Sequence, residues 1–140
     1  MRSTADGWAF DTSVAVASLD PNHEAHATCR RALVKLRPAL AGHAAFETYA
    51  VLTRLPPPAR LAPAQASETL RAAFPERCWL GTRETERLWT GLENLELAGG
   101  SVYDALIGAA ARAAHRQLLT RDRRAERVYL AVGVDYQYLD

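Results

Sequence analysis

The chain has 140 residues, of which 49% are hydrophobic and 24% charged, and its 17 basic and 16 acidic side chains give a net charge of +1. These values are ordinary for a folded domain and exclude a disordered or collagen-like chain. The near-zero charge also excludes a strongly basic or acidic protein whose partner could be named from bulk charge. We expect one domain over residues 1–140, with residues 1–7 as a candidate disordered N-terminal tail.

The sequence shows no segment typical of a membrane span or a secretory signal. Its longest stretch without a charged residue, Pro38 to Phe46, is nine residues, about half of the ~18 that a membrane span requires. Cys29 and Cys78 are the two cysteines, and so few cysteines are typical of buried thiols in a reducing compartment. We therefore expect a cytoplasmic protein with no membrane association.

Short apolar runs alternate with amphipathic segments along the chain. We expect strands at 8–10, 40–42, 78–80, 117–120 and 134–138. We expect a helical or turn segment over 12–19 and helices over 21–37, 44–55, 63–74, 82–95, 102–115 and 123–132. Asp20 and Thr82 are the expected N-caps of two of these helices. This alternation predicts an α/β fold with a central parallel sheet flanked by helices on both faces.

Four carboxylates interrupt this pattern because they follow strands or lie in apolar surroundings. Asp11 and Asp122 come at the ends of two predicted strands, where open parallel sheets bind ligands. Glu47 lies among apolar residues of its helix, and Asp104 begins the apolar stripe of another. A carboxylate at the edge of a core is costly unless it is paired. We expect these four side chains to gather at one edge of the sheet.

Each of the four acids also has a structural interpretation that involves no ligand. Asp11 and Asp122 could cap the segments that follow them, and Asp104 could complete a capping box with Ser101. Glu47 could form an ion pair with an arginine of a neighbouring helix. As a set, however, four carboxylates without a neighbouring lysine favour a hard cation, Mg²⁺ or Mn²⁺, held by oxygen ligands.

Four segments in this order resemble the PIN domain, specifically the VapC family of toxin ribonucleases from toxin–antitoxin modules. The matching segments are Phe10-Asp11-Thr12-Ser13-Val14, Phe46-Glu47-Thr48-Tyr49, Tyr103-Asp104-Ala105-Leu106-Ile107-Gly108-Ala109-Ala110 and Leu119-Thr120-Arg121-Asp122. The resemblance runs through nearly the whole chain, and it implies a PIN fold with Asp11, Glu47, Asp104 and Asp122 as the catalytic, metal-binding acids. Arg124 stands where some relatives carry a further acid, so the number of metal ions, one or two, stays open.

The resemblance further implies an endoribonuclease that acts on RNA, commonly tRNA or rRNA, and depends on Mg²⁺ or Mn²⁺. It implies a homodimer that is neutralised by a cognate VapB-type antitoxin. We expect metal-assisted hydrolysis by water, which leaves a 5′-phosphate and a 3′-hydroxyl. The candidates for holding the RNA backbone are a run of arginines late in the chain. They are Arg112, Arg116, Arg121, Arg123, Arg124 and Arg127.

The alternative hypothesis is a non-catalytic α/β module that binds RNA or a peptide. A groove between the helices at 44–55 and 62–74 could accept an amphipathic partner helix. Only the enzyme hypothesis requires all four acids and a divalent metal.

Overall fold

The computed structural model describes residues 7–140. As the sequence predicts, five strands form one parallel sheet. The strand order in this sheet is β3-β2-β1-β4-β5. The strands are β1 (Trp8–Phe10), β2 (Ala39–Ala41), β3 (Arg77–Cys78), β4 (Gln117–Thr120) and β5 (Tyr136–Tyr138). From β1 the chain adds β2 and then β3 toward one edge of the sheet, whereas β4 lies on the other side of β1. The gap between β1 and β4 is therefore the point where the strand order reverses, which is where such sheets bind ligands.

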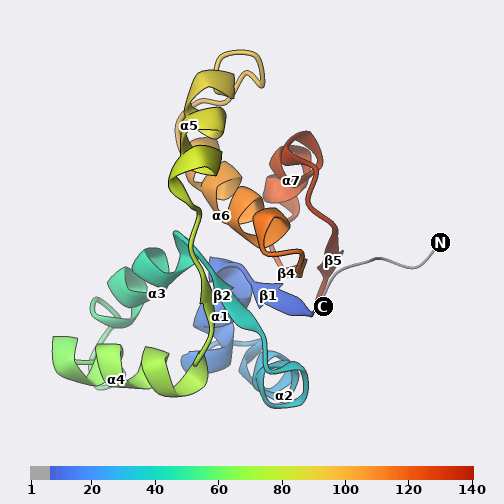
Figure 1. Cartoon of the computed structure of the whole chain (residues 1–140). Coiled ribbons are helices and arrows are strands. Elements are labelled where there is room, and N and C mark those ends of the chain that lie inside the picture. The colour runs from blue at the N-terminus through green and yellow to red at the C-terminus, as the bar shows by residue number, and fades with distance from the viewer. Residues whose placement is uncertain (1–6) are drawn as a thin grey trace.

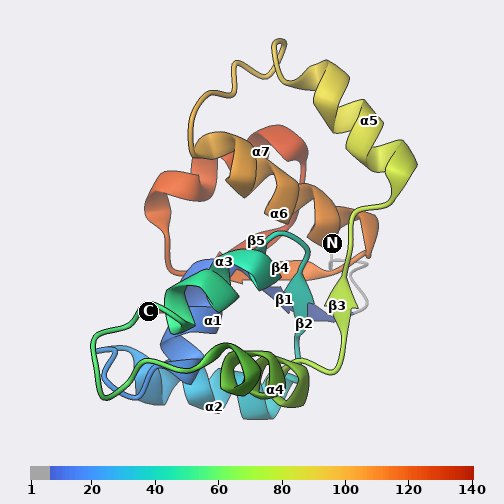
Figure 2. The same cartoon turned by 90° about the vertical axis from the view of Figure 1, so that its left-hand side faces the viewer.

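Helices cover both faces of the sheet (Figures 1 and 2). They are α1 (Thr12–Leu19), α2 (His26–Leu36), α3 (Ala44–Leu52), α4 (Pro63–Ala73), α5 (Thr82–Gly91), α6 (Ser101–Ala113) and α7 (Glu126–Val132), with a 3₁₀ turn, η1 (Arg123–Ala125), before α7. In Figure 2, α6 and α7 lie above the sheet and α1, α2 and α4 below it. Helix α5 packs on α6 and has no buried residue.

The core lies on both faces of the three central strands, β2, β1 and β4. Phe10, Leu40 and Leu118 are fully buried because each of their strands has neighbours on both sides and helices above and below. Phe74 from the end of α4 meets Phe10 edge to face, with 5.9 Å between the ring centroids. This packing fixes the ends of the central strands and, with them, the residues that follow.

Several predicted boundaries were wrong, each for a local reason. Helix α2 begins at His26 and not at Pro21, because the Asp20 side chain accepts a hydrogen bond from the Asn22 backbone and closes a turn instead. Helix α3 ends at Leu52, three residues early, because the Thr53 hydroxyl bonds back to the carbonyls of Tyr49 and Ala50.

The later boundaries shift in the same way. Helix α5 has Gly81 and not Thr82 at its N-cap, and it ends at Gly91. Strand β5 begins at Tyr136, so Val134 belongs to the buried connection before it. The predicted tail concerns residues that, apart from Gly7, lie outside the described part of the chain.

Both cysteines are free and buried, as the sequence predicts. Among residues 7–140, no helix combines the length and apolar character needed to cross a membrane.

Candidate active site

The structure brings all four predicted acids to one cavity of about 440 Å³ at the carboxyl ends of β1 and β4. Each acid comes from a different element: the end of β1, helix α3, helix α6 and the end of β4. The residues that line this cavity, here the acidic cavity, are Asp11, Thr12, Ser13, Glu47, Ala50, Val51, Arg54, Asp104, Ile107, Asp122 and Tyr129.

Asp11 is the most buried of the four, with a relative exposure of 2%. One carboxylate oxygen, Oδ1, accepts hydrogen bonds from the Ser13 hydroxyl at 2.6 Å and from the Val14 backbone at 3.2 Å, and so caps α1. The other, Oδ2, accepts from the Tyr129 hydroxyl at 2.8 Å. Burial raises the pKa of Asp11, although the hydrogen bonds oppose that rise.

The Ser13 hydroxyl joins the ends of β1 and β4. It donates to Asp11 and accepts a hydrogen bond from the Arg121 backbone at 2.8 Å. At the end of β4, the Thr120 hydroxyl accepts from the Asp122 backbone at 3.0 Å. Ser13 therefore fixes the two strand ends relative to each other, and Thr120 fixes the backbone of Asp122.

Glu47 is held by residues on two elements. Its Oε1 accepts a hydrogen bond from the Thr12 hydroxyl at 2.6 Å, and its Oε2 lies 3.9 Å from Nε2 of His43, one helical turn earlier. Within residues 7–140 Glu47 forms no ion pair with an arginine. The structure therefore does not show the arginine pairing that the sequence offered as an explanation of Glu47 without a ligand.

Asp104 carries the clearest electrostatic signature in the cavity. Burial and the nearby charges of Asp122, Glu47 and Asp11 raise its pKa from 3.8 to about 6, against the opposing effect of Arg124. The proposed capping box is absent, because the Ser101 hydroxyl bonds to the backbone of Ala98 instead. Asp104 therefore lies near three other carboxylates, and the charge of Arg124 offsets their effect only in part.

Asp122 follows β4 and caps η1, where its Oδ1 accepts a hydrogen bond from the Arg124 backbone at 3.0 Å. The same oxygen lies 3.8 Å from Nε of Arg124, whose side chain is almost fully exposed. Asp11 and Asp122 therefore act as helix caps, as one interpretation of the sequence predicted, and also line the acidic cavity.

The donor set of the cavity fits a divalent cation with oxygen ligands. After burial, the charges of the other three carboxylates contribute to the raised pKa of Asp104, and a bound cation would relieve this repulsion. Among residues 7–140, no three His, Cys, Asp or Glu side chains are arranged to enclose an ion on their own. Mg²⁺ keeps several of its waters and commonly binds through one or two carboxylates, so this open arrangement suits it.

Sequence reasoning missed two residues of the acidic cavity. Tyr129 is 1% exposed and resembles any core aromatic in the sequence, so no local signal marks its bond to Asp11. Arg54 lies seven residues after Glu47. On a helix this spacing places both residues on one face, together with Ala50 and Val51, and that spacing could have indicated that Arg54 lines the cavity.

Most of the six arginines proposed to hold RNA lie outside the acidic cavity. Arg116 donates to the Trp8 carbonyl and to Glu76, and Arg121 donates to the Leu139 carbonyl. Arg123 pairs with Asp140, and its guanidinium lies 3.9 Å from the centre of the Tyr138 ring.

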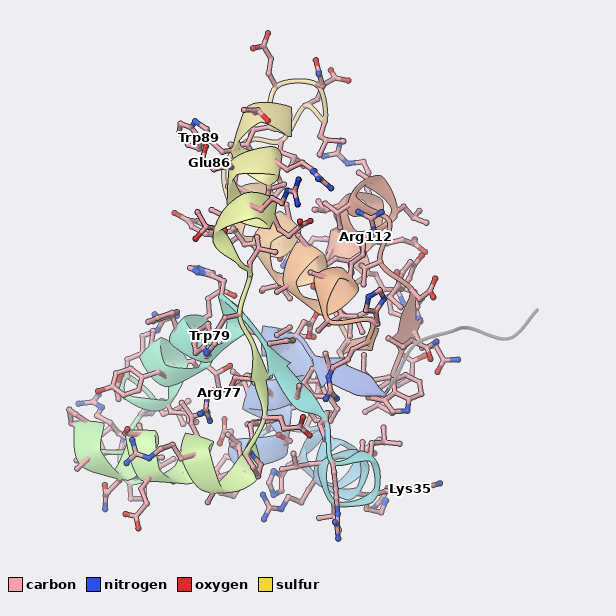
Figure 3. The ribbon with its side chains drawn as sticks, in the orientation of Figure 1. Lys35, Arg77, Trp79, Glu86, Trp89 and Arg112 are labelled. Carbon is pink, nitrogen blue, oxygen red and sulfur yellow. The ribbon has the colours of Figure 1, made fainter. Side chains whose placement is uncertain are left out.

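Of the other three, Arg112 lies close to Gly133 beyond the end of α7 (Figure 3), and Arg127 is exposed and lines no part of the cavity. Arg124, through its pairing with Asp122, is the one of the six beside an acid of the cavity.

The chain is similar to known proteins over nearly its whole length. The PIN domain model matches residues 9–130. Ribonuclease VapC27 of Mycobacterium tuberculosis (strain ATCC 25618 / H37Rv) is 45% identical over 126 residues, which cover 90% of this chain and 92% of that protein. Ribonuclease VapC40 of the same species is 41% identical over 128 residues, covering 91% and 95%.

A solved structure has the same fold. The crystal structure of VapBC2 from Rickettsia felis bound to a DNA fragment from its promoter superposes with a TM-score of 0.65. It covers 95% of this chain and 98% of the matched chain at 15% identity. At that identity the likeness shows the fold.

Proposed function

The chain belongs to the PIN-domain family and, within it, to the VapC ribonucleases, and we propose that it is a toxin-type endoribonuclease. Its reaction is the hydrolysis of RNA phosphodiester bonds, with tRNA or rRNA as the expected substrates. Asp11, Glu47, Asp104 and Asp122 form the acidic site that would bind the divalent cation, Mg²⁺ or Mn²⁺, on which the reaction depends.

The observation that carries this proposal is the meeting of four carboxylates from four elements at the β1/β4 switch point. Within residues 7–140, Asp122 is the one of the four within 4.0 Å of an arginine, the largely exposed Arg124. Such an arrangement costs folding free energy. It is understandable in a site that binds a cation and is hard to explain as a structural core.

The residues of the acidic cavity have different roles in the proposed reaction. A divalent cation, when bound, supplies Lewis-acid chemistry that lowers the pKa of water and stabilises charge on the phosphate. Asp11, fixed by Ser13, Val14 and Tyr129, presents a carboxylate that does not need to reorganise. Glu47, oriented by Thr12, faces the same space.

The fold also supports a proposal about partners. The structural neighbour is a complex named VapBC2, and we propose a VapB-type antitoxin as the partner of this chain.

We also propose a homodimer, because four large aromatic side chains are exposed within residues 7–140. Phe46 and Trp79 are 65% and 54% exposed with ring centroids 5.7 Å apart, and Trp89 projects from α5 (Figure 3); Tyr103 is the fourth. The alternative, a non-catalytic binding module, gives the four acids no role and is not favoured.

The test is cleavage of a pool of tRNA and rRNA by antitoxin-free protein. The reactions contain Mg²⁺, Mn²⁺ or EDTA, with Asp11→Asn and Asp104→Asn as variants and Glu68→Gln, an exposed acid of α4, as the matched control. We expect discrete cuts with 5′-phosphate ends that EDTA and both site variants abolish and the control retains.

Two results would contradict the proposal. Cutting that persists in both site variants would place the activity elsewhere or in a contaminant. RNA that stays intact under all conditions, with no heat of Mg²⁺ or Mn²⁺ binding, would favour the binding module.

A further inference from the structure

Arg54 is a basic side chain of the acidic cavity, which is otherwise lined by acids, hydroxyls and apolar groups. It follows the last turn of α3, where its backbone donates to the Val51 carbonyl. Glu47 on α3 and Arg54 in the turn that follows α3 line the same cavity. The Arg54 side chain is exposed.

The guanidinium of Arg54 is not paired with an acid among the described residues. Within residues 7–140 it forms no ion pair of 4.0 Å or less, whereas Arg116, Arg123 and Arg124 each pair with an acid. An arginine beside four carboxylates would ordinarily be expected to pair with one of them. Arg54 instead keeps its five donors available at the mouth of the cavity.

A site made of four acids repels the polyanion that it must bind. A bound cation offsets part of this charge at the scissile phosphate, but the neighbouring phosphates of the strand still approach a negative cavity. A planar guanidinium is the side chain best suited to grip a phosphate, through two parallel hydrogen bonds.

We propose that Arg54 binds a backbone phosphate of the RNA strand beside the scissile bond and so holds the strand in register with the four acids. This inference rests on the proposed endoribonuclease function and adds a substrate-binding residue to it. The contact is to the backbone, so it positions the strand without reading its sequence.

The experiment compares Arg54→Ala and Arg54→Lys with Arg30→Ala, which removes the same charge from an exposed position on α2 away from the cavity. Cleavage is measured at saturating Mn²⁺, with thermal unfolding as the check on folding. We expect kcat/KM to fall roughly 10- to 100-fold in Arg54→Ala, less in Arg54→Lys, and not at all in Arg30→Ala.

A binding measurement separates this inference from the proposed function. Binding of a labelled single-stranded RNA to the Asp104→Asn protein, with and without Arg54→Ala, is titrated between about 50 and 200 mM salt. Loss of one phosphate contact lowers the slope of log K against log salt by about 0.7.

The outcomes are distinct. If the parent protein cleaves RNA and Arg54→Ala matches Arg30→Ala in both rate and salt slope, the Arg54 inference is overturned and the proposed function stands. If the parent protein does not cleave RNA, the proposed function fails and the salt slope alone decides whether Arg54 contacts phosphate. A rate that falls with an unchanged slope also overturns the phosphate contact.

Discussion

The hydroxyl of Tyr129 donates a hydrogen bond to Oδ2 of Asp11 at 2.8 Å, across 118 residues of sequence. Because the Ser13 hydroxyl and the Val14 backbone engage the other oxygen, the buried carboxylate is oriented from two sides. Burial and the Asp11 charge raise the pKa of Tyr129, so this hydroxyl remains a donor throughout the physiological pH range. Helix α7 therefore positions a residue that belongs to the opposite end of the chain.

Tyr129→Phe tests this relationship. We expect the free energy of unfolding to fall by about 1–3 kcal/mol, because a buried acceptor loses a donor. The Tyr129 bond lowers the pKa of Asp11, so its loss should also move the acid limb of the cleavage profile to higher pH. Denaturant unfolding and pH–rate profiles check both effects. Tyr136→Phe, which loses a bond to Glu126 outside the cavity, should leave the profile in place.

Asp104 should make the metal-free protein more stable in mild acid. A folded-state pKa of about 6 lies above the ordinary 3.8, so the folded state binds this proton more tightly than the unfolded state. The contribution of Asp104 is therefore most favourable below pH 3.8 and is lost as the pH rises through about 6. The measurement is thermal unfolding in EDTA at several pH values from about 3.8 to 7.5.

Asp104→Asn provides the matched comparison. At pH 7.5 in EDTA we expect the variant to melt a few degrees above the parent protein, because it removes one of four repelling charges, while cleavage is lost. Adding Mn²⁺ should stabilise the parent protein more than the variant. A variant that melts at or below the parent temperature in EDTA would contradict the electrostatic account of this cavity.

Thr12 should act on the cation through Glu47. Thr12→Val keeps the shape of the side chain but removes the hydroxyl that donates to Oε1 of Glu47. We expect Mn²⁺ affinity to fall by about 10- to 100-fold, the usual effect of losing a group that orients a ligand. Thr12→Ser retains the donor and should retain the affinity. Isothermal calorimetry distinguishes the two variants, and equal affinities would remove Thr12 from the site.

Gly108 should be intolerant of a side chain because α7 packs directly against it. A Cβ there would lie 2.8 Å from Cγ2 of Val132 and 3.1 Å from Cδ1 of Tyr129. We expect Gly108→Ala to destabilise the fold by about 1–3 kcal/mol and to weaken cleavage by displacing Tyr129. Gly91→Ala, at the end of α5 with open space around it, should be neutral or slightly stabilising. Denaturant unfolding of the two variants gives the comparison.

The positions of the strand-end acids could be predicted because parallel strands deliver their carboxyl ends to one edge of the sheet. Asp11 and Asp122 each follow a short apolar run, and that local pattern is sufficient to place them. Glu47 and Asp104 were found from apolar neighbours on their helices. In each case the signal lies within a few residues of the acid.

The rest of the site depends on contacts that have no local signal. Tyr129 and Asp11 are neighbours only because β1 lies beside β4, and nothing around Tyr129 records that pairing. The start of α2 was wrong because an Asp-Pro pair can begin a turn as readily as a helix. The late arginines were poor candidates because their partners, such as Glu76 and Asp140, lie far from them in sequence.

The place of β1 next to β4 also determines when the protein can become active during its own synthesis. Asp11 leaves the ribosome 118 residues before Tyr129, an interval of about 6 to 24 s at an elongation rate of ~5–20 residues per second. For most of this interval the growing chain has Asp11 but lacks β4 and Asp122, and until its end it lacks the Tyr129 hydroxyl. The acidic cavity is therefore complete only after β4 and α7 have been synthesised.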